Sequence, residues 1–281
     1  MSAKTLAVAT PSASVIVRAR DSRAELEALL PLLRRQTMSA EVVVVDSGSR
    51  DGSLEVAERL ADRVIRLEAG TYSPGRALNT GAREATGEIV FAFSSHCRPP
   101  SDDWIERSLA HYERPDVAAT NGSPNGPDHR PFEGVFYQDS AHARTHPQWG
   151  FSNHASSWRQ SVWREHHFDE EVTTAEDRLW AIDVTARGWV IAFDPSLSVE
   201  LEHRWKHGAR NFMRRERREL IVIGSHAAMP PYTFAMLVSD WWRRIPDDRH
   251  STAFHRIVNY RRAAGLIGKY LGHREARRTR R

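Results

Sequence analysis

The sequence predicts an α/β protein in which a mostly parallel sheet is flanked by helices and followed by a C-terminal helical extension. Three observations indicate this fold class. Short β-branched runs alternate with helical patterns over the first 120 residues, an order typical of parallel sheets. Residues 41–46 (EVVVVD) form a continuous apolar run, as in a strand buried on both faces. Beyond Gly208 the pattern is helical, with breaks at Pro230-Pro231 and Pro246.

The individual elements follow from the same patterns. Strands are expected where β-branched residues cluster, at 14–18, 41–46, 63–67 and 88–93, and later at 190–194 and 198–202. Helices are expected at 24–36, 53–60, 75–85, 102–113 and 176–187. Asp51 is the predicted N-cap of the second helix. Prolines and glycines interrupt residues 121–150, so we expect loops there, over the open end of the sheet.

Size and charge exclude several classes of protein. A chain of 281 residues, 40% apolar and with nine Trp, forms a folded core of one large or two small domains. Its net charge of +4 is concentrated at the end, because residues 261–281 carry eight basic side chains and one acidic one. Residues 1–260 therefore sum to −3. The basic excess belongs to the tail and not to the body, and we expect no nucleic-acid partner.

The cysteine count and the hydropathy bear on the compartment. Cys97 is the single cysteine, which excludes an intramolecular disulfide and a cysteine-based zinc cluster. No run approaches the 18 or so apolar residues of a membrane span, and the N-terminus lacks a signal-peptide pattern. We expect a cytoplasmic protein. The sequence makes no prediction of its oligomeric state.

Polar side chains follow three predicted strands, at 18–21, 46–51 and 94–98. Ligands of open α/β sheets bind beyond the carboxyl ends of the strands, so these segments predict a binding site. Four motifs in this order resemble the family 2 glycosyltransferases of the GT-A fold: residues 42–51 (VVVVDSGSRD), 75–82 (GRALNTGA), 85–88 (ATGE) and 175–180 (AEDRLW). The resemblance covers residues 14–205. It implies a GT-A domain at 1–205 and a helical extension with a basic tail at 206–281.

The resemblance implies an inverting transferase that moves a hexosyl or N-acetylhexosaminyl group from a nucleotide-sugar donor to an acceptor hydroxyl. Asp46 matches the residue that binds the pyrimidine, and its acceptor oxygens suit uracil or thymine, hence a UDP- or dTDP-sugar. Ala19, Arg20 and Ser47 would flank the base. Arg76 and Asn79 match the helix start that reaches the diphosphate. The alternatives are a turn-forming Asp46 and a solvated helix face.

The metal motif departs from the family. Ser94-Ser95-His96 stands where relatives carry Asp-x-Asp, which binds a divalent cation. His96 takes the place of the second aspartate, and His203 follows the last strand where relatives place another ligand. These two histidines and the phosphates would form a mixed nitrogen and oxygen shell for manganese or magnesium. Alternatively, Ser94, Ser95 and the histidines hydrogen-bond the phosphates in a site without metal.

Glu176 and Asp177 match the acidic pair of the family on the acceptor side. Asp177 is expected to take the proton of the attacking hydroxyl, as a general base. Residues 174–177 also match a capping box, in which the acid only satisfies backbone donors. Asn153, His154 and Trp180 are expected to form a wall for the acceptor or donor sugar, with Trp149 or Trp158 stacking on a sugar ring.

The C-terminal segment offers a further hypothesis. Trp241, Trp242, Arg243 and Arg244, with the basic tail, would seat the enzyme on the inner face of an anionic membrane, where a lipid-linked acceptor resides. The alternative is a packed aromatic pair and a solvated tail.

The implied role is in polysaccharide, glycolipid or natural-product biosynthesis. Two rival functions stay open. One is a non-catalytic nucleotide-sugar-binding relative, suggested by the missing Asp-x-Asp. The other is a sugar-nucleotide pyrophosphorylase, although residues 18–21 (RARD) replace its glycine-rich loop.

Overall fold

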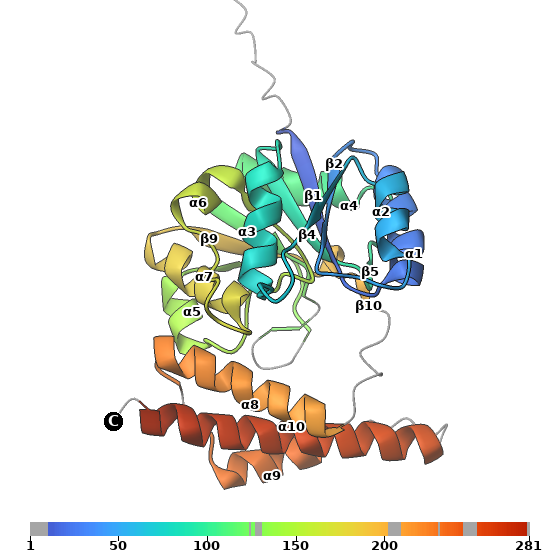
Figure 1. The fold of residues 1–281 in the computed structure, drawn as a ribbon. Helices are drawn as coiled ribbons and strands as arrows, with labels where there is room; N and C mark the ends of the chain where they lie inside the picture. Colours follow the sequence, from blue (N-terminus) through green and yellow to red (C-terminus); the bar gives the residue numbers. More distant parts are fainter. Residues whose placement is uncertain are drawn as a thin grey trace, which may run out of the picture.

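An eight-stranded sheet forms the centre of the molecule (Figure 1). The computed structural model describes residues 11–123, 125–126, 131–201, 209–229, 231–243 and 252–279. Its strands are β1 (Ala13–Ala19), β2 (Glu41–Asp46), β3 (Arg63–Arg66), β4 (Ile89–Ser94), β5 (Cys97–Arg98), β6 (Val117–Asn121), β7 (Phe136–Gln138), β8 (Ala155–Arg159), β9 (Val190–Phe193) and β10 (Glu200–Leu201). The order in the main sheet is β3-β2-β1-β4-β8-β6-β9-β7, and β5 pairs with β10 in a second, two-stranded sheet.

Helices cover both faces of the main sheet. They are α1 (Arg23–Arg34), α2 (Ser53–Leu60), α3 (Pro74–Glu84), α4 (Trp104–Ala110), α5 (Ser140–Thr145), α6 (Gln160–Glu165) and α7 (Glu176–Ala186), and the C-terminal helices are α8 (Ala209–His226), α9 (Phe234–Arg243) and α10 (Thr252–Thr279). In β1, Val15 and Val17 face the core under α1, α2 and α4, whereas Ile16 faces the core under α3, α6 and α7. This alternation is the period of two that a strand imposes.

The sheet is mostly parallel and has one switch point. Strand β1 pairs in parallel with β2 on one side and with β4 on the other, so the connections run in opposite directions from β1. Strand β8 is antiparallel to both β4 and β6. Ligands of open α/β sheets bind where the strand order reverses. The topology therefore directs attention to the carboxyl ends of β1 and β4.

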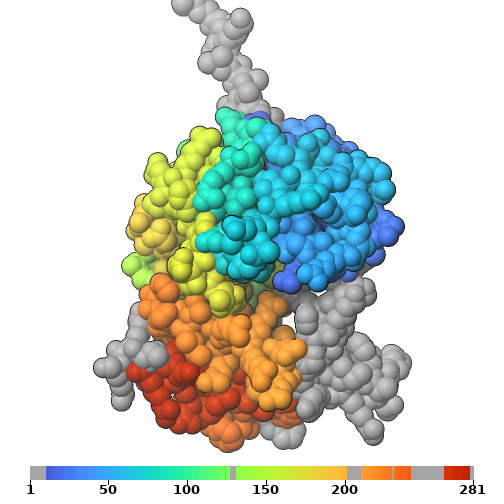
Figure 2. Space-filling view, viewed as in Figure 1, coloured from blue at the N-terminus to red at the C-terminus, as the bar shows by residue number. Residues whose placement is uncertain are grey.

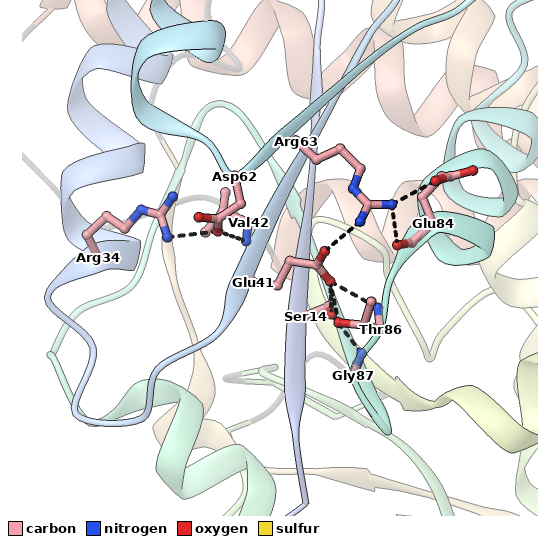
Figure 3. A network of polar contacts seen from close by, with 9 residues as sticks. All are labelled: Ser14, Arg34, Glu41, Val42, Asp62, Arg63, Glu84, Thr86 and Gly87. Carbon is pink, nitrogen blue, oxygen red and sulfur yellow. Dashed lines mark hydrogen bonds and ion pairs between the residues drawn. The ribbon is translucent and has the colours of Figure 1, made fainter.

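The amino ends of the strands are closed by a polar network (Figure 3). Glu41 accepts hydrogen bonds from the Ser14 hydroxyl at 2.7 Å and from the Thr86 backbone N–H at 3.0 Å, and it lies 3.5 Å from Arg63. Burial acts to raise the pKa of Glu41, but these hydrogen bonds and the Arg63 charge outweigh it and hold the pKa below its usual value. The polar side chains at this end of the sheet are therefore held in place by contacts with one another.

The C-terminal helices lie beneath the carboxyl ends of the strands (Figure 1), where α8 contacts α7, and their orange surface adjoins the surface of the part of the chain that holds the sheet (Figure 2). The long helix α10 packs closely against α8. A Cβ atom at Gly268 would lie 2.4 Å from the Met213 carbonyl oxygen, so only glycine permits this approach. Among the residues that the structure describes, none of the helices has the length and apolar character needed to cross a bilayer.

The expected fold class is confirmed, but three local predictions are wrong. The predicted loops at 121–150 contain β7 and α5, because Phe136 packs on Phe193 and β7 pairs with β9. Asp51 is not the N-cap of α2; Gly52 is, with φ of 93°, while Asp51 accepts a hydrogen bond from the Ser53 N–H at 3.0 Å. The strand predicted at 198–202 is shortened to β10.

Candidate functional site

A cavity of about 660 Å³ opens at the carboxyl ends of β1 and β4, where the strand order reverses. Part of the lining comes from residues 18–178 and part from α8. The first part includes Arg18, Ser94, Ser152, Asn153, His154, Glu176, Asp177 and Arg178; the part on α8 includes Asn211, Arg214, Arg215, Glu216, Arg218 and Glu219. The cavity is therefore lined by charged groups of both signs.

Arg18, at the end of β1, is anchored across the switch point. Its Nη2 atom donates to the Ser94 hydroxyl at 3.1 Å and to the Asn153 backbone and side-chain oxygens at 2.9 and 2.6 Å. Its Nε is buried without a hydrogen-bond partner among the described residues. A buried donor without a partner costs stability, so this guanidinium is held in place with hydrogen-bonding capacity left for a ligand.

The acidic pair lies at the start of α7. Ala175, the residue before the helix, has φ of 63°, a left-handed conformation that costs a non-glycine residue about 1 kcal/mol. No side chain caps this helix, so the alternative of a capping box is wrong. Asp177 accepts from the Asn153 N–H at 3.1 Å through one oxygen and from the Arg178 N–H at 2.8 Å through the other. The strained turn directs both acids toward the cavity.

Glu176 is only 3% exposed and accepts a hydrogen bond from the Asn153 side-chain amide. Burial, followed by the charge of Asp177, raises the pKa of Glu176 to about 7, and Arg18 opposes this shift. Next to it, Arg178 lies 3.1 Å from Asp177 and 3.4 Å from Glu219. Although burial disfavours its charge, these carboxylates hold the pKa of Arg178 above its usual value.

Several residues predicted to bind the nucleotide lie beside the cavity, in loops that are already hydrogen-bonded. Asp46 is 3% exposed and accepts from the N–H groups of Gly48 and Ser49 at 3.0 and 3.1 Å and from the Ser49 hydroxyl. This is the geometry of the turn-forming alternative. Ala19 ends β1 opposite Asp46, and its carbonyl accepts from the Ser47 N–H at 3.0 Å. Arg20 is exposed on the next position.

The start of α3 is similarly engaged. Arg76 donates through Nε to Glu170 at 2.9 Å, so the side chain of Arg76 is not simply part of a solvated helix face. Asn79 is 1% exposed; it donates to the Phe168 carbonyl at 2.8 Å and to Glu170 at 2.9 Å, and accepts from Trp163 Nε1 at 2.9 Å. The side-chain amide of Asn79 thus joins α3 to the 163–170 segment.

Of the residues predicted to form the sugar wall, some line the cavity and others lie in the core. Asn153 and His154 line the cavity as expected. Trp180 is 3% exposed and packs in the core against Phe151 and Phe168, so its assignment to the wall is wrong. Trp158 is fully buried in β8 and also unavailable for stacking. Both indoles contribute their apolar area to the core.

Residues 94–96 (SSH) end β4 and form the turn that leads to β5. The Ser94 hydroxyl is bonded to Arg18, the Ser95 carbonyl accepts from Arg98 at 2.8 Å, and the His96 ring lies 5.8 Å from that of His154. His203 lies outside the described residues. Within the described ranges, no group of three or more His, Cys, Asp or Glu side chains could hold a metal ion. The described residues alone do not form a cation site.

Sequence reasoning missed two parts of the cavity. It named residues 18–21 only as a strand end, because nothing in the local pattern links Arg18 to Asn153, 135 residues later. It also passed over the arginines of α8. Their spacing, at 214, 215 and 218, places them on one helix face and was a usable signal.

Comparison with known proteins gives a consistent match. The family model of glycosyl transferase family 2 matches residues 14–166. The glycosyltransferase AglE of Haloferax volcanii is 29% identical over 131 residues, which are 41% of this chain and 42% of the relative. The chain thus matches about two fifths of the length of this curated relative.

Solved structures resemble the chain over most of its length. The mannosyltransferase PcManGT of Pyrobaculum calidifontis, solved with GDP-Man and Mn2+, has a TM-score of 0.59 and 20% identity, covering 96% of this chain and 74% of that one. S. aureus TarS 1-349 with UDP-GlcNAc has a TM-score of 0.56 and 18% identity, covering 95% and 92%. These likenesses show a mixed, mostly parallel sheet of the GT-A type.

Proposed function

Because the chain belongs to glycosyl transferase family 2, we propose that it transfers a sugar from a nucleotide-sugar donor to an acceptor hydroxyl, with inversion at the anomeric carbon. The observation that carries this proposal is the cavity at the switch point, where the anchored Arg18 and the buried pair Glu176 and Asp177 meet. A positive group and two acids side by side suit a reaction in which a diphosphate leaves while a hydroxyl loses its proton.

Asp177 is the proposed general base. In an inverting displacement the hydroxyl attacks from the side opposite the leaving diphosphate, so the base must lie on the acceptor side. The Asn153 N–H and Arg178 hold the Asp177 carboxylate in place. Glu176 carries the proton more readily at neutral pH, since its pKa is raised to about 7. Having one acid protonated limits the repulsion between the two.

The proposed donor is a UDP- or dTDP-linked hexose or N-acetylhexosamine. The loops after β1 and β2, with Ala19, Arg20, Asp46 and Ser47, would flank the base, and Arg76 would reach the diphosphate with the N–H groups that Glu170 does not use. The relatives named above bind UDP-GlcNAc and GDP-Man, so a screen must include both. Thermal shift with each nucleotide sugar tests the proposal, because a bound ligand stabilises the native state.

The proposed cofactor is manganese or magnesium, with His96 and His203 as ligands. Support comes from Leu201, two residues before His203, which pairs with Cys97, the neighbour of His96. A bound cation would neutralise charge on the diphosphate. The described residues do not complete the cation site. The nucleotide screen run with Mn2+ and with EDTA tests this assignment: equal shifts in both would favour histidines that bind phosphate directly.

A non-catalytic binding relative is the second candidate, favoured by the missing Asp-x-Asp. Donor hydrolysis separates the two functions. A transferase slowly releases free sugar and nucleoside diphosphate from its donor without an acceptor, whereas a binding protein leaves the donor intact. Release of pyrophosphate from a nucleoside triphosphate and a sugar phosphate would instead indicate a pyrophosphorylase.

Contact with a membrane surface is proposed for the C-terminal helices. Exposed apolar side chains occur on both α9 and α10, where Phe234 is 64% and Ile267 44% exposed, and Phe234 contacts Tyr270. Exposed basic residues Arg277 and Arg278 follow on α10. Arg244 and the last two arginines lie outside the described residues. Cosedimentation with anionic and neutral liposomes tests this: recovery in the supernatant with both would contradict it. The cytoplasmic location stays a prediction, as does the biosynthetic pathway.

A further inference from the structure

Three arginines of α8 line the same cavity as the acidic pair. Arg214, Arg215 and Arg218 all line it, and so does Asn211, one turn earlier. Positions spaced by three and four residues lie on the same helix face, so the three guanidinium groups form one basic wall. We use the term basic wall for these three arginines.

The basic wall has no counter-charge bound to it. None of its three guanidinium groups makes a hydrogen bond or ion pair with any residue that the structure describes, and all three are exposed. By contrast, Arg217 on another face of α8 pairs with Glu275 at 2.9 Å, and Arg178 pairs with Asp177 and Glu219. Like charges at these spacings destabilise a helix by a few tenths of a kcal/mol per pair. An anionic ligand would offset that cost.

The acids in the cavity neutralise the basic wall only in part. Asp177 and Glu219 are engaged with Arg178. Burial and then the charge of Glu219 raise the pKa of Glu216, although the charge of Arg215 opposes this shift. Glu176, with its raised pKa, also carries less negative charge near neutral pH than an exposed glutamate. The basic wall is therefore the part of the cavity with a surplus of positive charge.

The position of the basic wall separates it from the donor base. The loop that holds Asp46 does not line the cavity, whereas Asp177 does. A group bound to the basic wall would lie in the same cavity as the proposed general base. We propose that Arg214, Arg215 and Arg218 bind an anionic group of the acceptor, a phosphate or a carboxylate, and so bring its hydroxyl to Asp177. Guanidinium groups bind either anion with paired hydrogen bonds. This inference rests on the proposed transferase function.

The test uses the full chain and small probes. The parent and R214Q/R215Q/R218Q are saturated with UDP and titrated with glycerol 1-phosphate, with glycerate and with neutral glycerol, while UDP binding is measured separately. A matched control, R59Q/R144Q/R164Q, removes the same charge from exposed positions that do not line the cavity. The lysine variant R214K/R215K/R218K restores charge without the paired geometry.

We expect the parent and the matched control to bind at least one anionic probe and not glycerol, the glutamine variant to lose at least tenfold in probe affinity, and the lysine variant to recover part of it. UDP affinity should stay within about twofold. Equal probe binding by parent and glutamine variant, or binding by neither, overturns the proposal. If UDP affinity falls instead, the basic wall serves the donor diphosphate and the acceptor assignment is wrong. If no nucleotide binds while the arginine-dependent probe binding persists, the proposed transferase function fails and the anion site stands.

Discussion

A carboxylate at one end of the central sheet and a carboxylate at the other end have pKa values shifted in opposite directions. At the amino end, Glu41 is surrounded by donors and its pKa is lowered (Figure 3). At the carboxyl end, Glu176 is buried next to Asp177 and its pKa is raised to about 7. The first arrangement stabilises the fold, and the second costs stability that a ligand or a reaction can use. Pairs of variants at the two ends test this contrast.

The largest effect is expected at the carboxyl end, from Asp177→Asn. The amide cannot accept the hydroxyl proton, and general-base catalysis is typically worth about 10²–10⁴ in rate, so kcat should fall by that factor. Steady-state transfer, measured with the donor found by thermal shift, gives the value. Turnover within about tenfold of the parent, in a variant with an unchanged melting temperature, would remove Asp177 from the role of base.

Glu176→Gln is expected to stabilise the protein at high pH. Since the pKa of Glu176 is about 7 in the folded chain and near 4.5 when unfolded, the native state holds a proton that the unfolded state releases between these values. Stability therefore falls as pH rises from about 4.5 through 7, and the cost above pH 7 is about 3 kcal/mol. Urea unfolding should show this gain for the variant at pH 8 and little difference at pH 4.5. A loss of stability at pH 8 would contradict the assignment.

The opposite sign is expected for Glu41→Gln. A carboxylate with a lowered pKa contributes stability that is present above its unfolded pKa and is lost as pH falls through its folded pKa. The variant should lose about 2 kcal/mol at pH 7, the scale of hydrogen bonds to a charged group. The deficit should shrink as pH falls below 4.5. Urea unfolding of both glutamine variants in one pH series compares the two ends directly, and a pH-independent deficit would indicate a packing effect instead.

The smallest effect is expected from Arg76→Gln. Arg76 and Arg83 both pair with Glu170, at 2.9 and 3.2 Å, but only Arg76 is proposed to reach the diphosphate. Its loss should weaken UDP binding by about tenfold, the lower end for a charged hydrogen bond. Arg83→Gln is the matched control and should leave UDP affinity unchanged. Equal affinities for the two variants would mean that Arg76 serves only to hold Glu170.

The first half of the fold was predictable because local signals agree there. The predicted strand at 41–46 and helix at 53–60 have the same bounds as β2 and α2. Strand β8 was missed since its Ser156 and Ser157 are fully buried, and a buried serine looks like a loop residue in a sequence. The hydroxyl of Ser157 is bonded to Tyr112 at 2.8 Å and Thr120 at 2.7 Å, contacts that only the folded sheet creates.

The site was predictable to the extent that its residues lie in motifs. Glu176 and Asp177 were found because their motif is contiguous, and both line the cavity. Trp180 belongs to the same motif but serves the core, so a motif does not separate contact residues from supporting ones. Arg18 depends on Asn153, and the basic wall depends on how α8 lies against the first domain. The contact of Arg18 has no local signal, and the spacing of the α8 arginines shows that they share a helix face but not that this face lines the cavity.

The glycines of α10 determine how closely this helix packs against α8. Gly268 and Gly272 lie against the backbone of α8, so their missing side chains set the distance between the two helices. Replacing the arginines on the cavity face is expected to leave the spacing between α8 and α10 unchanged. The residues that set the spacing between the two helices, Gly268 and Gly272, are therefore different from the arginines proposed to bind the acceptor.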